Sequence, residues 1–303
     1  MTAKATFGPY VLGEKVGEGG MGAVYQAHRG SDDGQEHYAV KLLSVTNIDS
    51  EEDKKRFLQE CKALEHVQHP HILELIDYGV EDGVPYLVTE FCTDRNGASL
   101  SLGALAERCN GVLEVHTLKV LVPQICWALS YTHQLGMVHR DIKPENVLLQ
   151  ENTYGGLTTK LGDFGLASVT VDSDYIWRPS WEEGEGETTD DDEAEEGGSD
   201  EVDGNFSGTY DYMSPEQMDG EPLDARSDVF SFGVMLYRLA TGYDRVTFEK
   251  PTEINGELPA WIDEMVARAI VPDREERAKS ALELLFLLPD DLRPGGIQRS
   301  VAY

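Results

Sequence analysis

The sequence predicts an α+β fold with two lobes: a small β-rich N-terminal lobe with one key helix, and a larger, mostly helical C-terminal lobe. Residues 10–45 alternate apolar and polar side chains around glycines, which is typical of antiparallel strands. Residues 51–66 place apolar side chains at helical spacing, and helical patterns dominate from about residue 100 onward. A length of 303 residues is sufficient for two such lobes.

The remaining elements follow in chain order. The helix predicted at 51–66 is amphipathic, with an apolar face formed by Phe57, Leu58, Cys61 and Leu64. Residues 71–91 return to strand-like composition, which extends the N-terminal sheet. In the C-terminal lobe, helical patterns cover residues 115–135, 215–219, 225–240, 259–270 and 279–287.

The charge of the chain is strongly acidic. Residues 182–203 contain 13 acidic side chains and no basic one, in a low-complexity run with Gly and Ser that we expect to be disordered or mobile. Without these 13 charges the net charge of −31 would still be −18. This balance argues against nucleic acid and anionic membranes as partners, because both require basic surface.

Cysteine usage and hydropathy indicate the compartment. The chain has no CxxC pair, and its scattered cysteines suggest reduced thiols of a cytoplasmic protein rather than a disulfide framework or a zinc site: Cys61, Cys92, Cys109 and Cys126. Residues 1–10 lack the apolar core of a signal peptide, and the longest apolar runs are too short to span a membrane. We therefore expect a soluble chain without a membrane segment.

Two short motifs carry most of the chemical information. Residues 139–146 read His-Arg-Asp-Ile-Lys-Pro-Glu-Asn, which gathers the carboxylate of Asp141, the ammonium of Lys143 and the amide of Asn146 within six residues. Residues 163–165 read Asp-Phe-Gly and supply a second carboxylate, that of Asp163. Magnesium prefers hard oxygen ligands, usually one or two carboxylates plus substrate phosphates. A hydroxyl nucleophile needs a carboxylate to orient it and accept its proton.

These motifs resemble those of eukaryotic-like (Hanks-type) serine/threonine protein kinases, and the stretches 17–25 and 208–217 are most like bacterial members. The resemblance implies the bilobal protein-kinase fold, with ATP and Mg²⁺ as cofactors. It implies that Asp141 is the catalytic base, that Lys143 neutralises the transferring phosphate, and that Asn146 and Asp163 bind the metal. The sequence Lys143-Pro144-Glu145 resembles serine/threonine kinases more than tyrosine kinases.

The resemblance also implies boundaries. It gives an N-lobe at 1–91, a C-lobe at 92–288 and a C-terminal tail at 289–303. The activation segment would be 163–216, with the acidic run 182–203 as an insert.

A glycine string precedes these motifs. It reads Gly17-Glu18-Gly19-Gly20-Met21-Gly22 and is followed by Val24, and glycines let backbone amides approach phosphates without Cβ clashes. Dinucleotide-binding folds use a similar string, but there a helix opens directly after it, whereas here strand-like sequence continues. The resemblance therefore favours a nucleotide-binding role for Gly17, Gly19 and Gly22.

Further positions follow from the same resemblance. Lys41, in Tyr-Ala-Val-Lys, would orient the phosphates of ATP and pair with Glu60 on the following helix. Thr89 would be the gatekeeper, and Glu90 to Cys92 the hinge that holds adenine. The apolar walls of the adenine site would be Val16, Val24, Ala39 and Leu148.

Three distant positions match residues that stabilise the C-lobe in this family. Glu216, in Ser-Pro-Glu, would form a salt bridge with Arg277, and Asp228 would brace the catalytic loop. The sequence departs from the family in its long activation segment, in Ser168 where a basic residue is frequent, and in a short stretch between Tyr243 and Pro259 where a substrate-docking helix is usual.

The sequence therefore predicts an ATP-dependent serine/threonine protein kinase that phosphorylates protein substrates and itself, with self-association as a route to autophosphorylation. Two alternatives stay open. One is a pseudokinase-type nucleotide-binding scaffold without turnover, and the other is a small-molecule phosphotransferase of related fold. The filled catalytic positions argue against the first, and the Ser-Pro-Glu motif with Thr209, which shapes a peptide shelf in the family, argues against the second.

Overall fold

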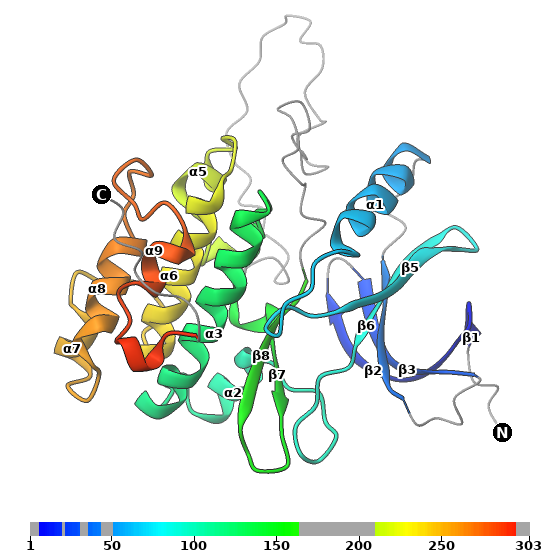
Figure 1. Ribbon diagram of the computed structural model, residues 1–303, viewed down its shortest axis with the longest axis horizontal. Coiled ribbons are helices and arrows are strands. Elements are labelled where there is room, and N and C mark those ends of the chain that lie inside the picture. Colours follow the sequence, from blue (N-terminus) through cyan, green and yellow to red (C-terminus); the bar gives the residue numbers. More distant parts are fainter. Residues whose placement is uncertain (1–5, 20–21, 31–35, 44–50, 164–209, 295–303) are drawn as a thin grey trace, which may run out of the picture.

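A computed structural model describes residues 6–19, 22–30, 36–43, 51–163 and 210–294. Figure 1 shows a strand-rich lobe, coloured blue to cyan, beside a helical lobe coloured green to red. The α+β, two-lobed architecture predicted from the sequence is confirmed. The acidic run 182–203, Phe164-Gly165, and Gly20-Met21 of the glycine string lie outside the described residues.

The N-terminal lobe is an antiparallel sheet with the strand order β1-β2-β3-β4-β6-β5. Its strands are β1 (Thr6–Phe7), β2 (Tyr10–Gly19), β3 (Gly22–Arg29), β4 (Tyr38–Leu43), β5 (Leu75–Glu81) and β6 (Val84–Glu90). In β4 the side chains of Tyr38, Val40 and Leu43 are buried, while the side chains between them, including Lys41, are only half-buried. This alternation presents Lys41 on the face of the sheet opposite to Val40.

The helix α1 (Glu51–Leu64) packs on the sheet. Its residues Phe57 and Cys61 are buried together with Leu43, and Leu75 of β5 packs against this cluster. Leu58 belongs to the predicted apolar face but is 38% exposed, because it lies on the side of the helix turned away from the sheet.

The C-terminal lobe is built around α6 (Ala225–Thr241), which is buried along almost its whole length. Gly233 of α6 has no side chain because α8 lies close to it. A Cβ on Gly233 would lie 2.6 Å from Cβ of Ala269. The other elements are α2 (Leu102–Arg108), α3 (Val115–Gln134), β7 (Val147–Glu151), β8 (Leu157–Leu161), α5 (Pro215–Met218), α7 (Pro251–Ile254), α8 (Ala260–Ala269) and α9 (Ala281–Leu285), with the 3₁₀ turns η2 (Pro144–Asn146) and η4 (Asp290–Leu292).

The helices predicted from periodicity are confirmed within a few residues of their expected ends. The stretch between Tyr243 and Pro259 contains only the one-turn helix α7, which agrees with its shortness in the sequence. Among the described helices, none combines the length and the apolar character needed to cross a lipid bilayer.

The two lobes are joined by more than the chain that follows β6. The amide of Leu73 donates to the carbonyl of Leu161 at 2.9 Å, and the amide of Leu161 donates to the carbonyl of His71 at 2.9 Å. Lys160 of β8 also forms an ion pair with Glu90 at the end of β6, at 2.7 Å. These contacts fix the segment that precedes Asp163 against the N-terminal lobe.

Candidate active site

The loop that carries Asp141 is held by a buried carboxylate from α6. Asp228 accepts hydrogen bonds from the backbone amides of His139 and Arg140, both at 2.8 Å, and its side chain is 1% exposed. His133 of α3 donates from Nε2 to the same carboxylate at 3.0 Å. Burial raises the pKa of Asp228, but the hydrogen bonds and charges around it outweigh this effect and keep its pKa below the ordinary value. The predicted bracing role of Asp228 is confirmed.

Asp141 is oriented by two neighbours in the same loop. Lys143 Nζ lies 2.8 Å from Asp141 Oδ2, and Asn146 Nδ2 donates to that oxygen at 2.9 Å. Asn146 also donates to the backbone carbonyl of Asp141 at 2.7 Å. Because the amide nitrogen of Asn146 is used in this way, the atom it offers to a metal is its amide oxygen, which is a hard ligand.

Asp163 is tied to the same loop through backbone contacts. His139 donates from Nε2 to the carbonyl of Gly162 at 2.9 Å, and the amide of Gly162 donates to the carbonyl of Asn146 at 2.9 Å. Asp163 has a φ of 54°, a left-handed conformation that is uncommon for a residue with a side chain. The two motifs recognised in the sequence therefore form one polar cluster.

Lys41 reaches this cluster from the N-terminal lobe and forms an ion pair with Asp163. Burial raises the pKa of the Asp163 carboxyl, but the charge and hydrogen bond of Lys41, with smaller contributions from His139 and Lys143, hold that pKa below the ordinary value. Asp163 is therefore ionised at neutral pH and is 40% exposed, so it remains accessible.

Glu60 lies on α1 and is 9% exposed. The structure pairs Lys41 with Asp163, and no described ion pair joins Lys41 to Glu60. Glu60 lies instead within electrostatic reach of Arg140: burial lowers the pKa of that guanidinium, while Asp228 and Glu60 act in the opposite direction. The expected pairing of Glu60 with Lys41 stays a prediction.

The described glycines of the string lie at the end of β2 and the start of β3. Gly17 lies opposite Val24, and Gly19 lies opposite Gly22. Gly22 has a φ of 137°, and a Cβ on it would lie 2.0 Å from the carbonyl oxygen of Leu42. Only glycine fits there without moving β4, the strand that carries Lys41.

The expected adenine-site residues come from five strands and the segment after β6. Ala39 lies opposite Thr89 in the β4–β6 pair, and Val24 lies opposite Lys41 in the β3–β4 pair. The walls are half-buried and come from β2, β3, β4 and β7: Val16, Val24, Ala39 and Leu148. Their role in binding adenine stays a prediction.

The expected hinge is anchored by side chains. Thr89 donates from Oγ1 to the carbonyl of Glu90 at 3.1 Å, and the Glu90 carboxylate accepts from the amide of Glu74 at 2.9 Å. Cys92 is buried, and burial raises the pKa of its thiol to about 12, so this thiol is neutral.

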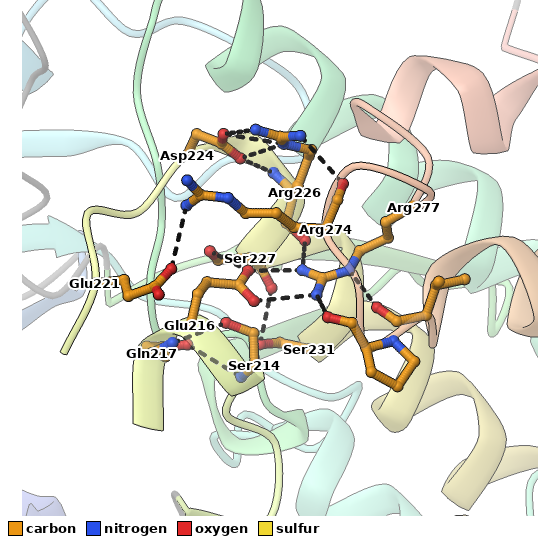
Figure 2. A network of polar contacts seen from close by, with 12 residues as sticks. Ser214, Glu216, Gln217, Glu221, Asp224, Arg226, Ser227, Ser231, Arg274 and Arg277 are labelled. Carbon is orange, nitrogen blue, oxygen red and sulfur yellow. Dashed lines mark hydrogen bonds and ion pairs between the residues drawn. The ribbon is translucent and has the colours of Figure 1, made fainter. Parts of the chain in front are cut away.

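The buried pair between Glu216 and Arg277, predicted from the sequence, is confirmed (Figure 2). Arg277 donates from Nη1 and Nη2 to the two carboxylate oxygens of Glu216, at 2.6 and 3.0 Å. Ser227 donates to the same carboxylate at 2.8 Å. Arg277 also donates to the backbone carbonyls of Val271, Arg226 and Pro272. The pair connects α5 to α6 and to the segment before α9.

Sequence reasoning missed two residues that contact this site. His133 donates to Asp228, and Gln217 donates to the backbone carbonyl of Arg140 at 2.6 Å. Both lie close to recognised motifs, but neither residue type marks a site by itself. Their partners are known only once the fold places α3 and α5 beside the loop.

Known proteins resemble this chain over most of its length. A family model described as "Protein kinase domain" matches residues 10–286. A probable serine/threonine-protein kinase of Clostridium acetobutylicum is 30% identical over 291 residues, covering 91% of this chain and 39% of the relative. The serine/threonine-protein kinase pkn3 of Myxococcus xanthus is 34% identical over 228 residues, covering 75% of this chain and 36% of the relative. This chain thus spans about two fifths of the length of these relatives.

A solved structure resembles most of the chain. The crystal structure of the Mycobacterium tuberculosis PknI kinase domain has a TM-score of 0.65 and 25% sequence identity, covering 95% of this chain and 98% of that one. The fold, the polar cluster around Asp141 and Asp163, and the match of residues 10–286 agree, and the chain belongs to the protein kinase domain family.

Proposed function

We propose that this chain transfers the γ-phosphate of ATP to serine and threonine hydroxyls of proteins. The observation that carries the proposal is the polar cluster in which Lys143 and Asn146 orient Asp141 beside the ionised carboxylate of Asp163. The relatives named as serine/threonine-protein kinases support the choice of acceptor.

ATP would bind between the lobes. The hinge from Glu90 to Cys92 would hold adenine through its backbone, with the turn around Gly22 covering the phosphates and Lys41 binding them. The residues present fit Mg²⁺, because Asp163 offers an ionised carboxylate and Asn146 an amide oxygen. The metal would supply positive charge that neutralises the phosphate oxygens.

Asp141 would then act on the acceptor. As the hydroxyl oxygen attacks the γ-phosphorus, Asp141 accepts its proton, and the bond between the γ-phosphorus and the bridging oxygen of ADP breaks. Lys143 lies 2.8 Å from the Asp141 carboxylate, so its charge is positioned to neutralise the phosphoryl group during transfer. Phosphoryl transfer of this kind depends mainly on positioning and charge, which is what the cluster provides.

Protein substrates follow from family membership, and we include the chain itself among them through transient self-association. We place the domain in a reducing compartment such as the cytoplasm, since none of its four cysteines is in a disulfide.

A labelling experiment tests the proposal. The protein is incubated with magnesium and ATP carrying a labelled γ-phosphate, together with a generic protein acceptor, and the labelled amino acid is identified after hydrolysis. We expect phosphoserine and phosphothreonine, and a decrease in rate of about two to four orders of magnitude in Asp141→Asn. Absence of label from serine and threonine, or equal rates for wild type and Asp141→Asn, would rule the proposal out.

A further inference from the structure

The side chain of Gln217 joins two parts of the backbone that are far apart in the sequence. It lies in the one-turn helix α5, directly after Glu216, and its Nε2 donates to the carbonyl of Arg140 at 2.6 Å. Its Oε1 faces the amide of Ser214 at 3.5 Å, and its own amide donates to Ser214 Oγ at 3.3 Å. Figure 2 shows Gln217 beside Ser214 and next to the Glu216–Arg277 pair.

The Arg140 carbonyl that accepts this hydrogen bond belongs to the peptide bond between Arg140 and Asp141. The same peptide unit carries the amide of Asp141, which faces Nδ1 of His139 at 3.4 Å. Fixing the oxygen on one side and the amide on the other sets the plane of this peptide, and through it the direction in which the Asp141 side chain leaves the backbone.

The residue at this point is in a conformation that needs support. Arg140 has a φ of 70°, in the left-handed region, which is strained for a residue with a side chain. Its amide is held by Asp228 at 2.8 Å, and its carbonyl is held by Gln217. Without the second contact, the peptide that follows Arg140 would be held only through its amide, by the 3.4 Å contact with His139.

We propose that Gln217 is a positioning residue for phosphoryl transfer: its side-chain amide fixes the peptide plane before Asp141 to the first turn of α5. The proposal rests on the proposed function, since it assigns Asp141 the role of base. Glu216 binds α5 to the body of the helical lobe, and Gln217 binds the catalytic loop to α5. The helix α5 follows the segment between Asp163 and Ser214. Through Gln217, the position of α5 therefore sets the orientation of the Asp141 side chain.

The chemistry of the site selects glutamine. The side chain must donate to a carbonyl from one end and present an oxygen to an amide from the other, and a carboxamide does both. Glutamate at neutral pH has no donor and would direct a negative charge at the Arg140 carbonyl, while methionine has a similar length but no hydrogen-bond donor.

Two variants and a control test the proposal in the intact chain. Gln217→Met removes the hydrogen bond with little change in side-chain volume, and Gln217→Glu replaces the donor by a titratable group. Met218→Leu changes the next residue, which is 58% exposed, and serves as the control. For each protein we measure the initial rate of autophosphorylation against ATP concentration, the urea midpoint of unfolding, and amide hydrogen exchange of the peptide covering 139–146.

We expect Gln217→Met to lower kcat by about tenfold to a hundredfold, because small displacements of a catalytic group have effects of this size. The KM for ATP should stay within about twofold, since Gln217 does not face the expected nucleotide site. The 139–146 peptide should exchange faster, and Met218→Leu should match wild type throughout.

The rate of Gln217→Glu relative to wild type should rise as pH falls from 8 to 5.5. Protonation restores a donor to the side chain, and comparison with wild type at each pH cancels the pH effects that the two proteins share. A purely structural role for Gln217 would give no such recovery.

The proposed function and the positioning role of Gln217 can be refuted independently of each other. If wild type transfers no phosphate, the proposed function fails, but faster exchange of 139–146 in Gln217→Met still supports the positioning contact. If Gln217→Met keeps the wild-type kcat, or if 139–146 exchanges as in wild type, the positioning role is wrong whatever the activity of the wild-type chain.

Discussion

Replacing Glu216 by glutamine removes the negative charge from the buried pair with Arg277 while keeping the shape of the side chain. Both partners are almost fully buried, since 4% of the Glu216 side chain and none of the Arg277 side chain is exposed. Solvent therefore screens this pair little, unlike ion pairs on the surface. The variant leaves the Arg277 guanidinium buried next to a neutral amide.

The size of the effect follows from the pKa of Glu216. Burial raises this pKa, but the hydrogen bonds of Arg277 and Ser227 outweigh burial and lower it from an ordinary 4.5 to about 2. This difference corresponds to roughly 3 kcal/mol of stability at pH 7, at about 1.4 kcal/mol for each tenfold change in proton affinity. Removing one partner of a buried ion pair generally costs about 3–5 kcal/mol, which agrees with the value derived from the pKa of Glu216. We expect Glu216→Gln to lower the free energy of unfolding by about 3 kcal/mol.

The sign of the pH dependence follows from the lowered pKa. A carboxyl group with a lower pKa in the folded state contributes its full stability above its unfolded pKa of 4.5, and that contribution is lost as pH falls toward about 2. The difference between wild type and Glu216→Gln should therefore shrink by more than half, to about 1.4 kcal/mol, at pH 3.

Urea unfolding followed by circular dichroism at pH 7 and pH 3 measures both quantities. Glu221→Gln is the matched control, because Glu221 lies 3.8 Å from Arg274 in the same region and 54% of its side chain is exposed. Such an exposed pair contributes about 0–1 kcal/mol, so this variant should unfold almost like wild type. Equal destabilisation by the two variants, or a Glu216→Gln effect that stays constant between the two pH values, would refute the electrostatic reasoning.

Three further outcomes are expected. Gly22→Ala should weaken ATP binding in calorimetry, because its Cβ would lie 2.0 Å from the Leu42 carbonyl oxygen and displace the strand carrying Lys41; unchanged affinity would contradict this. Asp163→Ala should make ATP binding nearly independent of magnesium, since it removes the ionised ligand, and a preserved magnesium dependence would place the metal elsewhere. A thiol reagent at pH 8 should label one cysteine per folded chain, the exposed Cys109, as counted by mass spectrometry, because the other three are buried; labelling of two or more would disagree.

The sequence predicted the parts of the site that are local in the chain. Asp141, Lys143 and Asn146 lie within six residues, so their contact needs only one loop and one 3₁₀ turn to form. The helices of the two lobes were predicted equally well from hydrophobic periodicity. The 14-residue amphipathic helix α1 and the buried 17-residue helix α6 both leave strong patterns in the sequence.

Other features depend on tertiary structure and leave no such pattern. Lys41 pairs with a carboxylate 122 positions later in the chain, and no local spacing selects that partner, so the pair with Asp163 was not foreseen. Leu58 fits the apolar face of α1 by spacing, but only the position of the sheet decides that it is exposed. Gln217 acts through a backbone carbonyl 77 positions earlier, and no spacing rule connects a single glutamine to a main-chain oxygen at that distance.

The ion pair between Lys41 and Asp163 has a consequence for the order in which ligands bind. In this conformation the carboxylate of Asp163, which is proposed to hold the metal, is already paired with the ammonium of Lys41. Because both groups belong to one chain, Lys41 competes with the metal at a high effective concentration. Magnesium alone must displace that ammonium, whereas ATP gives Lys41 an alternative set of anionic oxygens and releases Asp163. Nucleotide and metal should therefore bind cooperatively, and by thermodynamic linkage each should increase the affinity for the other by the same factor.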